Sequence, residues 1–325
     1  MGFNIKSIGN ELAKADQLKD NIPTQVGMFT IKTANQTIKE ASLRPDPDAL
    51  WMSLWYEGEV CCLFADSNLG KSIYAVQIAA SIASSKKVLY FDFELSDKQF
   101  QLRYTGGDGT LNQFPKDLYR VEINRDALGS DNFEDTIIRN IEDAAVMTGA
   151  KVMIIDNLTY LCLASEKGDA AALLMMRLMN LKKKYDLSIL VLAHTPKRPL
   201  TNPITQNDLA GSKKLYNFFD SVFAIGKSAV DNRLRYIKQV KCRYGSFMYD
   251  ADNVIICEII KEGSFTQFAQ TGFATEKEHL KEPSDSDRAD MIATVKRLHA
   301  EGKTQRQIKE ETGLSLGSVN NYIKK

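Results

Sequence analysis

One short loop carries the clearest chemical signal in the sequence. Residues 65–72 read Ala-Asp-Ser-Asn-Leu-Gly-Lys-Ser, with an apolar run at 60–64 before them and apolar residues at helical spacing after them. A strand, a glycine-containing loop and a helix in this order bind phosphate, because the free backbone N–H groups and the dipole of a helix N-terminus attract an anion. In such a loop Gly70 lets the backbone pass close to phosphate, Lys71 reaches the β- and γ-phosphates, and the Ser72 hydroxyl ligates Mg²⁺.

The loop therefore predicts ATP and Mg²⁺ as cofactors. Its first position is usually Gly but is Ala65 here, and a methyl group is tolerable there if the backbone φ angle stays negative. The alternative is a chance Gly-Lys-Ser in a turn, and the strand before it and the helix after it argue against that. The nucleotide-binding residues that we predict are Asp66, Ser67, Asn68, Leu69, Gly70, Lys71, Ser72 and Ile73.

An acidic residue ends the apolar run at 151–156, which reads Lys-Val-Met-Ile-Ile-Asp. Its last residue, Asp156, is placed as the carboxylate that holds Mg²⁺ through water, together with Ser72. The alternative is an aspartate that merely caps a strand end. The next residue is Asn157 rather than Glu, so the catalytic base is not adjacent to Asp156, which argues against the AAA+ arrangement.

A second acidic residue, Glu94, follows the apolar run at 88–93. Parallel strands bring their carboxyl ends to one edge of a sheet, which places Glu94 beside the phosphate-binding loop. A glutamate at that place can orient and deprotonate a water molecule. We therefore predict Glu94 as the catalytic base.

The elements that must position these residues alternate along the chain, and alternating strands and helices predict an α/β fold, a mostly parallel sheet flanked by helices. The later runs are separated by turns and predict antiparallel hairpins. The expected parallel strands are 60–65, 87–93, 152–155, 188–193 and 221–225; the expected helices are 71–84, 97–105, 133–148 and 170–184; the expected hairpin strands are 235–241, 254–260 and 265–268.

Breaks in composition divide the chain into four parts. The first part has possible helices at 4–18 and 33–41 and ends at Arg-Pro-Asp-Pro, and the third is charged and contains Pro283. The predicted division is an N-terminal arm at 1–50, a nucleotide-binding domain at 51–275, a linker at 276–287 and a helical unit at 288–325.

Several segments resemble known ring-forming ATPases. Residues 93–103 resemble the Glu-Met-Ser…Gln…Arg stretch of DnaB-type replicative helicases, and 155–158 resemble their Walker B strand. Residues 192–197 resemble a strand end of the plasmid RepA-type hexameric helicases, and 238–245 are similar to the Lys-x-Arg-x-Gly hairpin of RecA-like ring ATPases. The resemblance covers roughly residues 55–270 and implies a RecA-like P-loop ATPase that assembles into a homo-hexamer or another ring.

The resemblance also implies roles for single residues. His194 is the polar residue that senses the γ-phosphate, and Lys241 and Arg243 enter the site of the neighbouring subunit. The alternatives are a hydrogen-bonded histidine at a strand end and two cations on a solvated strand. In the resembling helicases the loop equivalent to 195–214 faces nucleic acid in the central channel, which implies contacts from Lys197, Lys213 and Lys214, unless the loop is simply solvated.

The C-terminal segment is a local basic region. Residues 291–325 hold seven basic and three acidic side chains. They resemble the helix-turn-helix of resolvase-type and sigma-type DNA readers, with a core of Ile308, Leu314, Val319 and Ile323. This implies duplex DNA as a partner; the alternative is a small bundle that contacts protein. The residues expected to face the groove are Ser318, Asn320, Asn321 and Lys324.

The composition excludes several classes of protein. The chain has 325 residues, of which 44% are apolar and 26% charged, and its 42 Lys and Arg nearly balance its 41 Asp and Glu. Disorder is therefore excluded, and any nucleic-acid surface must be local. No apolar run approaches the ~20 residues of a membrane helix, and the N-terminus lacks the apolar stretch of a signal peptide. Five cysteines without a CxxC pair indicate reduced thiols of a cytoplasmic protein and no zinc site.

These features predict an ATP-hydrolysing, nucleic-acid-associated motor. The function expected first is a RepA- or DnaB-like DNA helicase, or a replication or mobilisation factor of a mobile element. One alternative is a DNA-binding regulator whose assembly ATP controls without unwinding. The other is a KaiC-like signalling ATPase whose tail binds protein.

Overall fold

The computed structural model describes residues 25–124, 133–161, 168–195, 198–209, 213–282 and 285–324. The helix expected at 4–18 lies outside these residues. The chain forms two compact units, Met1–Pro47 and Asp48–Lys325. In the described part of the first unit, β1 (Gln25–Val26) pairs with β2 (Phe29–Thr30), and α2 (Ala34–Ala41) begins after Thr33, whose side chain caps it.

A nine-stranded sheet forms the centre of the second unit, in the order β13-β12-β11-β10-β5-β9-β8-β6-β7. The six strands from β10 to β7 are parallel and the three at the other edge are antiparallel. The sequence predicted five of the parallel strands and all three antiparallel ones. Their bounds are β5 Val60–Ala65, β6 Val88–Asp92, β7 Leu118–Val121, β8 Val152–Asp156, β9 Ser188–His194, β10 Ser221–Lys227, β11 Leu234–Lys241, β12 Val254–Glu262 and β13 Phe265–Ala274.

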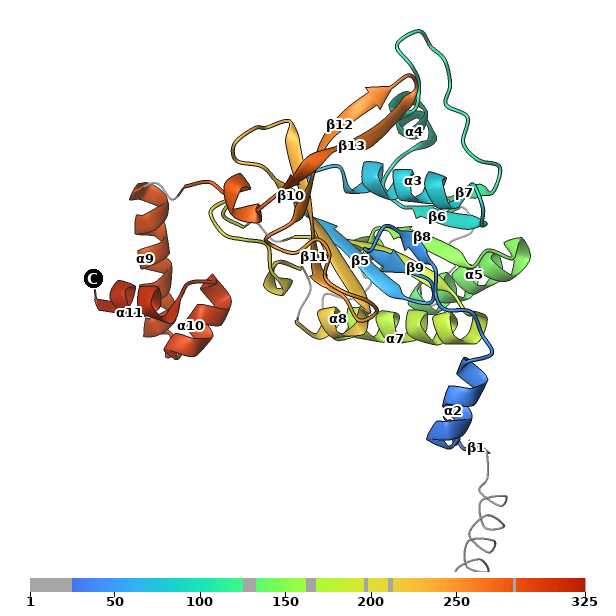
Figure 1. Ribbon diagram of the computed structural model, residues 1–325, viewed down its shortest axis with the longest axis horizontal. Coiled ribbons are helices and arrows are strands. Elements are labelled where there is room, and N and C mark those ends of the chain that lie inside the picture. Colours follow the sequence, from blue (N-terminus) through green and yellow to red (C-terminus); the bar gives the residue numbers. More distant parts are fainter. Residues whose placement is uncertain are drawn as a thin grey trace, which may run out of the picture. The chain divides into compact units, whose positions relative to one another are not determined.

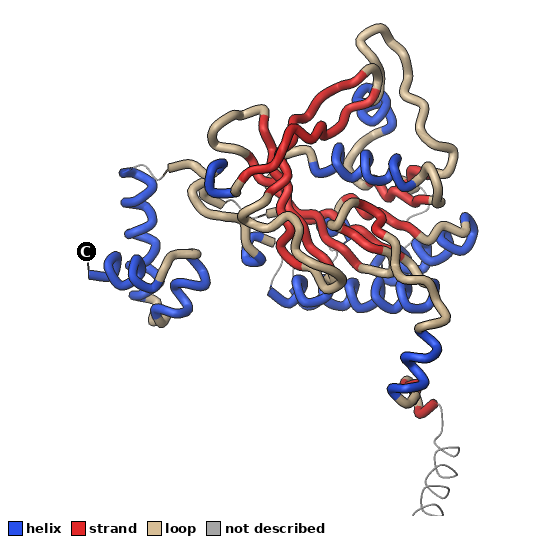
Figure 2. Tube along the Cα trace, in the orientation of Figure 1, coloured by secondary structure: helices blue, strands red, loops and turns tan. Residues whose placement is uncertain are grey.

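Helices cover both faces of this sheet, as Figures 1 and 2 show. One face packs against α3, with Ala75, Ile78 and Ala79 fully buried, and the other packs against α5, α7 and α8. This is the RecA-like core expected from the sequence. The bounds are α3 Lys71–Ile82, α4 Asp97–Arg103, α5 Phe133–Thr148, α6 Leu158–Leu161, α7 Gly168–Tyr185 and α8 Lys213–Phe218.

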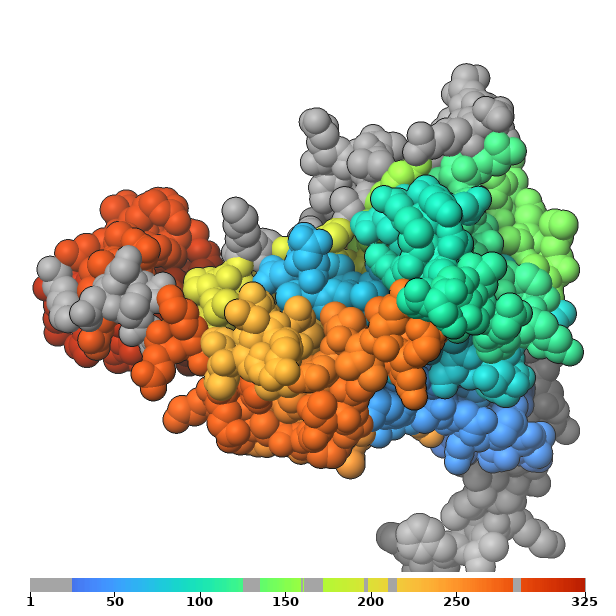
Figure 3. All heavy atoms as spheres, turned by 90° about the horizontal axis from the view of Figure 1, so that it is seen from above, coloured from blue at the N-terminus to red at the C-terminus, as the bar shows by residue number. Residues whose placement is uncertain are grey.

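The hairpin of β12 and β13 extends beyond the sheet and lies over the start of α3. The Gln77 side chain donates to the Phe268 carbonyl at 3.1 Å and accepts from its N–H at 2.8 Å, which fastens β13 to α3. Phe265 stacks on Tyr104 at a ring distance of 5.5 Å, and in the space-filling view the hairpin lies directly against the segment that follows α4 (Figure 3). The hairpin therefore lies on the same side of the sheet as α3 and the segment after α4.

Both predicted bounds of the linker, 276 and 287, were wrong. Residues Glu276–His279 form the 3₁₀ helix η3, and the side chains of Glu276 and His279 are buried. The buried carboxylate of Glu276 is neutralised by Lys238 and accepts the N–H of Ile204 at 2.7 Å, so a charged residue is held inside the protein rather than in solvent. At the other end, α9 (Asp285–Ala300) begins before the predicted boundary.

Three helices follow, α9, α10 (Gln305–Thr312) and α11 (Leu316–Lys324). Thr304 caps α10, and Gly313 ends it with a φ of 69°, a conformation that favours glycine. Their small core contains Val295, Leu298, Ile308 and Val319, with Leu314 and Ile323 partly buried against it. No described helix is both long and apolar enough to cross a membrane.

Several short elements were not predicted from the sequence. These are a hairpin of β3 (Ala49–Trp51) and β4 (Trp55–Tyr56), strand β7, helices α6 and α8, and the 3₁₀ helix η2 (Gln206–Asp208). The hairpin is held by Trp51, whose Nε1–H donates to the hydroxyl of Tyr74 in α3 at 2.8 Å.

Candidate active site

The predicted phosphate-binding and acidic residues meet at the carboxyl edge of the parallel strands. Ala65 at the end of β5 pairs with His194 at the end of β9, and Asp92 at the end of β6 pairs with Asp156 at the end of β8. Strand β9 separates β5 from β8, so His194 lies between the loop and the acidic residues. Glu94 follows Asp92 by two residues.

The phosphate-binding loop leaves the N-terminus of α3 open. Gly70 is the residue before the helix, has a φ of 94°, and provides no side-chain cap for the first N–H groups. These groups are therefore available to an anion. A Cβ on Gly70 would lie 2.7 Å from Cδ1 of Ile259 and 2.9 Å from Cε2 of Phe268, so both its dihedral angle and the hairpin above it require glycine. Ala65 has no positive φ, which removes the objection to a methyl group at the first loop position.

Lys71 bends back over its own loop. Its ammonium donates to the carbonyl oxygens of Ala65 at 2.9 Å and Asp66 at 3.1 Å. Burial lowers the pKa of Lys71, while the charges of Asp156, Glu94 and Asp66 oppose this. A cation held among three acidic residues is well placed to exchange these contacts for phosphate oxygens.

Asp156 and Ser72 fit a hard cation such as Mg²⁺. The Asp156 carboxylate is 2% exposed, and it accepts hydrogen bonds from the hydroxyls of Ser72 and, at 2.7 Å, Tyr90. Burial raises the pKa of Asp156 to about 6, against the effect of those two donors. A hydroxyl and a carboxylate side by side supply the oxygen ligands that Mg²⁺ uses alongside phosphate and water.

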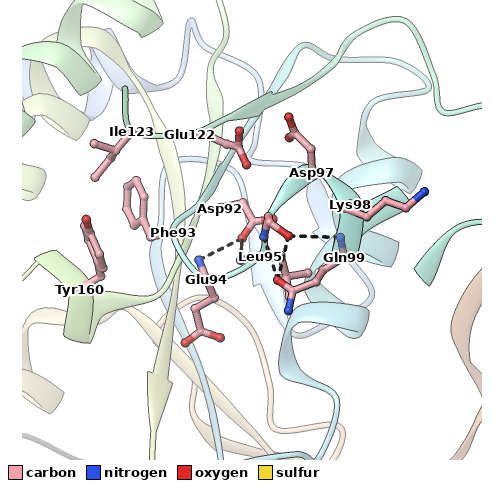
Figure 4. A pocket seen from close by; sticks show the side chains of 11 residues that line it. Asp92, Phe93, Glu94, Leu95, Asp97, Lys98, Gln99, Glu122, Ile123 and Tyr160 are labelled. Atoms are coloured by element: carbon pink, nitrogen blue, oxygen red, sulfur yellow. Dashed lines mark hydrogen bonds between the residues drawn. The ribbon is translucent and has the colours of Figure 1, made fainter. Parts of the chain in front are cut away.

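The turn after β6 presents Glu94. Oδ1 of the buried Asp92 accepts the N–H groups of Glu94 at 3.2 Å and Leu95 at 3.0 Å, and its Oδ2 accepts from Arg120 at 2.9 Å. Figure 4 shows this turn at the wall of a cavity of about 530 Å³, with the Glu94 carboxylate pointing away from Glu122 and Asp97. Asp92 thus shapes the backbone that carries Glu94.

A chain of close polar contacts joins the loop to Glu94. Nζ of Lys71 lies 3.3 Å from Nδ1 of His194, and Nε2 of His194 lies 3.5 Å from Oε1 of Glu94. The same Oε1 accepts from Nδ2 of Asn157. One imidazole therefore touches both the phosphate-binding lysine and the predicted base.

Lys241 and Arg243 lie near the end of the sheet at which the parallel strands begin, opposite the end that carries the phosphate-binding loop. Lys241 pairs with Val222 near the start of β10, and its ammonium donates to the Tyr216 carbonyl at 3.0 Å. Arg243 donates to Oδ1 of Asp220 at 3.0 Å, and Asp220 bonds to the backbone at the start of β5. Within one chain these two residues do not join the phosphate-binding loop.

The described residues predicted to contact DNA lie on α8 and α11. Lys197 lies outside the described residues, and Lys213 and Lys214 begin α8, where the backbone alone is described. The other four are on α11, where Asn321 and Lys324 are exposed and Ser318 and Asn320 are half-buried.

Sequence reasoning missed three residues of the site: Tyr90, Asp92 and Asn157. Asp92 and Asn157 both lie at or beside strand ends where the sequence had already predicted a functional residue. Their polar side chains next to Glu94 and Asp156 were the signal that could have identified them. Tyr90 carried none, because a tyrosine inside an apolar strand is typical of an ordinary core.

Part of the chain is similar to known proteins. A family profile described as "AAA domain" matches residues 30–199, just over half of the chain. Among solved structures, the chain is similar to a KaiC-like protein from the hyperthermophilic archaeon Pyrococcus horikoshii OT3, with a TM-score of 0.48 and 14% sequence identity over 66% of this chain and 91% of that one. No curated protein matches the sequence.

Proposed function

The chain belongs to the AAA domain family, and from this membership and the geometry of the site we propose that it hydrolyses ATP in a nucleic-acid-dependent reaction. The observation that carries the proposal is the path from Lys71 through His194 to Glu94. It brings a phosphate-binding cation, a residue that can sense the γ-phosphate and a general base into direct succession. The predicted Asp156 and Ser72 pair lies beside it.

Each residue has its own task in this reaction. The N–H groups at the start of α3 and the ammonium of Lys71 bind the phosphates. Ser72 and Asp156 would hold Mg²⁺, which when bound offsets the negative charge of the phosphate oxygens. Glu94 accepts a proton from the attacking water. His194 exchanges its contact with Lys71 for the γ-phosphate, which links occupancy of the loop to the base.

We propose further that a second copy of the chain completes the site, in a homo-hexamer or another ring. The position of Lys241 and Arg243 supports this, because they lie at the edge of the sheet opposite the phosphate-binding loop. Copies stacked in a ring would bring Lys241 and Arg243 of one chain to the phosphate-binding loop of the next. A guanidinium there would stabilise the charge that develops during transfer of the γ-phosphoryl group.

DNA is the proposed partner, and the proposed role is that of a RepA- or DnaB-like helicase or a replication or mobilisation factor of a mobile element. Single-stranded DNA would pass the loop 195–214 in the ring channel, and duplex DNA would bind the C-terminal helices as a helix-turn-helix. Support comes from the Gly313 turn between α10 and α11, and from the exposed Asn321 and Lys324 on α11.

Strand displacement on a forked DNA duplex tests this proposal. We expect ATP-dependent displacement by the wild-type protein and none by the Lys71→Ala variant, which controls for melting of the fork by binding alone. Duplex binding without displacement would instead identify an ATP-controlled DNA-binding regulator. A rate of ATP hydrolysis that does not change when DNA is added would identify a signalling ATPase.

A further inference from the structure

Asn157 has a side chain whose orientation is fixed by the backbone. It lies between β8 and α6, is 5% exposed, and its Oδ1 accepts the N–H of Tyr160 at 3.1 Å. This is the hydrogen bond of a helix N-cap, made here to the first turn of α6. The amide oxygen is therefore committed to the helix, and the NH₂ group must point the other way.

The NH₂ group of Asn157 points at the predicted base. Nδ2 donates to Oε1 of Glu94 and lies 3.2 Å from Nε2 of His194. The charged ammonium of Lys71 can only donate, so Nδ1 of His194 accepts from it and, in the neutral imidazole, Nε2 carries the proton. Nε2–H of His194 then faces Oε1 of Glu94 at 3.5 Å, and its 3.2 Å contact with Nδ2 of Asn157 is a contact between two donors. The hydrogen bond to Oε1 comes from Asn157.

Glu94 needs such support because burial does not hold it. Its side chain is 41% exposed, on a turn whose backbone Asp92 fixes but whose carboxylate Asp92 does not touch. Holding an exposed glutamate side chain in one orientation costs conformational entropy. The hydrogen bond from Asn157 to Oε1 fixes the carboxylate and leaves Oε2 to face the water.

We propose that Asn157 is a positioning residue for hydrolysis, which holds Glu94 in the orientation that takes a proton from water. The proposal rests on the proposed role of Glu94 as the base. It assigns no contact between Asn157 and the nucleotide. The proposal explains why residue 157 is an asparagine, because an acidic side chain at this position would repel the carboxylate of Glu94.

The substitution Asn157→Ser separates this role from capping. Serine caps a helix as well as asparagine does, but it cannot reach Glu94. We expect an unchanged melting temperature and unchanged nucleotide affinity, with single-turnover hydrolysis slower by about 10- to 100-fold, the loss typical of a misplaced catalytic group. Asn253→Ser is the matched control, because Asn253 is exposed in the turn just before β12, and it should hydrolyse at the wild-type rate.

A double-mutant cycle decides whether Asn157 acts through Glu94. In a Glu94→Gln background, Asn157→Ser should cause no further loss of the residual rate. Equal losses in both backgrounds, or a wild-type rate for Asn157→Ser alone, would overturn the proposal while leaving Glu94 as the base. A wild-type rate for Glu94→Gln alone would remove the base assignment and this proposal together.

Discussion

At the scale of single residues, His194 lies between the predicted phosphate-binding lysine and the predicted base. Its Nδ1 faces Lys71 at 3.3 Å and its Nε2 faces Glu94 at 3.5 Å. A phosphate that draws Lys71 away leaves Nδ1 without that donor, and the imidazole must then find a new arrangement. We therefore expect this one ring to couple phosphate binding to hydrolysis.

Replacing Glu94 by Gln keeps the shape of the side chain but removes its ability to take a proton. We expect the hydrolysis rate to fall by about 10²–10⁴-fold, the usual contribution of a general base. Nucleotide affinity, measured by calorimetry, should stay near normal. Glu122→Gln, on another wall of the same cavity, is the control and should retain activity. Equal rates for Glu94→Gln and the wild type would place the base elsewhere.

Asp156 predicts a pH dependence of stability in the absence of Mg²⁺ and nucleotide. Burial raises its pKa from 3.8 to about 6, so the folded protein binds this proton more tightly than the unfolded chain does. The stability contribution therefore falls as the pH rises from about 4 to about 6 and stays low above that. At 1.36 kcal/mol per pKa unit, the buried charge costs about 3 kcal/mol at neutral pH.

The substitution Asp156→Asn mimics the protonated carboxyl group and should remove this cost. Urea unfolding at pH 8 should show the variant more stable by up to about 3 kcal/mol, with the difference shrinking as the pH falls toward 4. Asp252→Asn, at an exposed position, should show no such gain. A pH-independent difference between Asp156→Asn and the wild type would contradict the assignment.

At the scale of elements, the hairpin of β12 and β13 and the start of α3 constrain each other. Gly70 has a φ of 94° and no room for a Cβ beneath Ile259 and Phe268. Gly70→Ala should therefore destabilise the protein by about 1–2 kcal/mol from the backbone alone, and weaken ATP binding as well. Gly107→Ala, at a site open to solvent without a positive φ, should stay within about 0.5 kcal/mol of the wild type. Equal stability of the two variants would contradict both the backbone constraint and the steric constraint at Gly70.

The sequence predicted the elements that have a strong apolar pattern and a polar residue at the end. The strand at 60–65 and the helix at 133–148 match the structure, because burial on a sheet or against it imposes their pattern. Strand β13 runs further than expected, to Ala274, since its far half pairs with β12 without an apolar alternation. The buried Glu276 was read as part of a solvated linker because its partner, Lys238, is distant in the chain.

The active site was predictable where residues stand next to each other in sequence and unpredictable where they meet only in space. Lys71, Glu94, Asp156 and His194 come together at one edge of the sheet, as the order of the strands required. The contacts of Asn157 with Glu94 and of Tyr90 with Asp156 join different strands. Such pairings need the register of the sheet, which a single sequence does not contain.

At the scale of the whole molecule, the position of Arg243 predicts a site shared between copies. Arg243→Ala should bind nucleotide but not hydrolyse it, since a finger supplied in trans is worth about 10³–10⁵ in rate. Lys71→Ala should be inactive for a different reason. Mixing the two inactive proteins should restore part of the activity, because some interfaces then combine an intact loop with an intact finger. Co-assembled subunits that remain inactive, or normal hydrolysis by Arg243→Ala alone, would refute the shared site.

The central claim is that the loop at 65–72 drives a nucleic-acid-dependent ATPase, and steady-state ATP hydrolysis with and without single-stranded DNA tests it most directly. The measurement compares the wild-type protein with Lys71→Ala, at fixed Mg²⁺ and low salt, over a range of DNA concentrations. We predict a slow basal rate that rises to saturation with DNA in the wild type and stays at background in Lys71→Ala. A wild-type rate that DNA leaves unchanged, or hydrolysis that survives the loss of Lys71, would contradict the account.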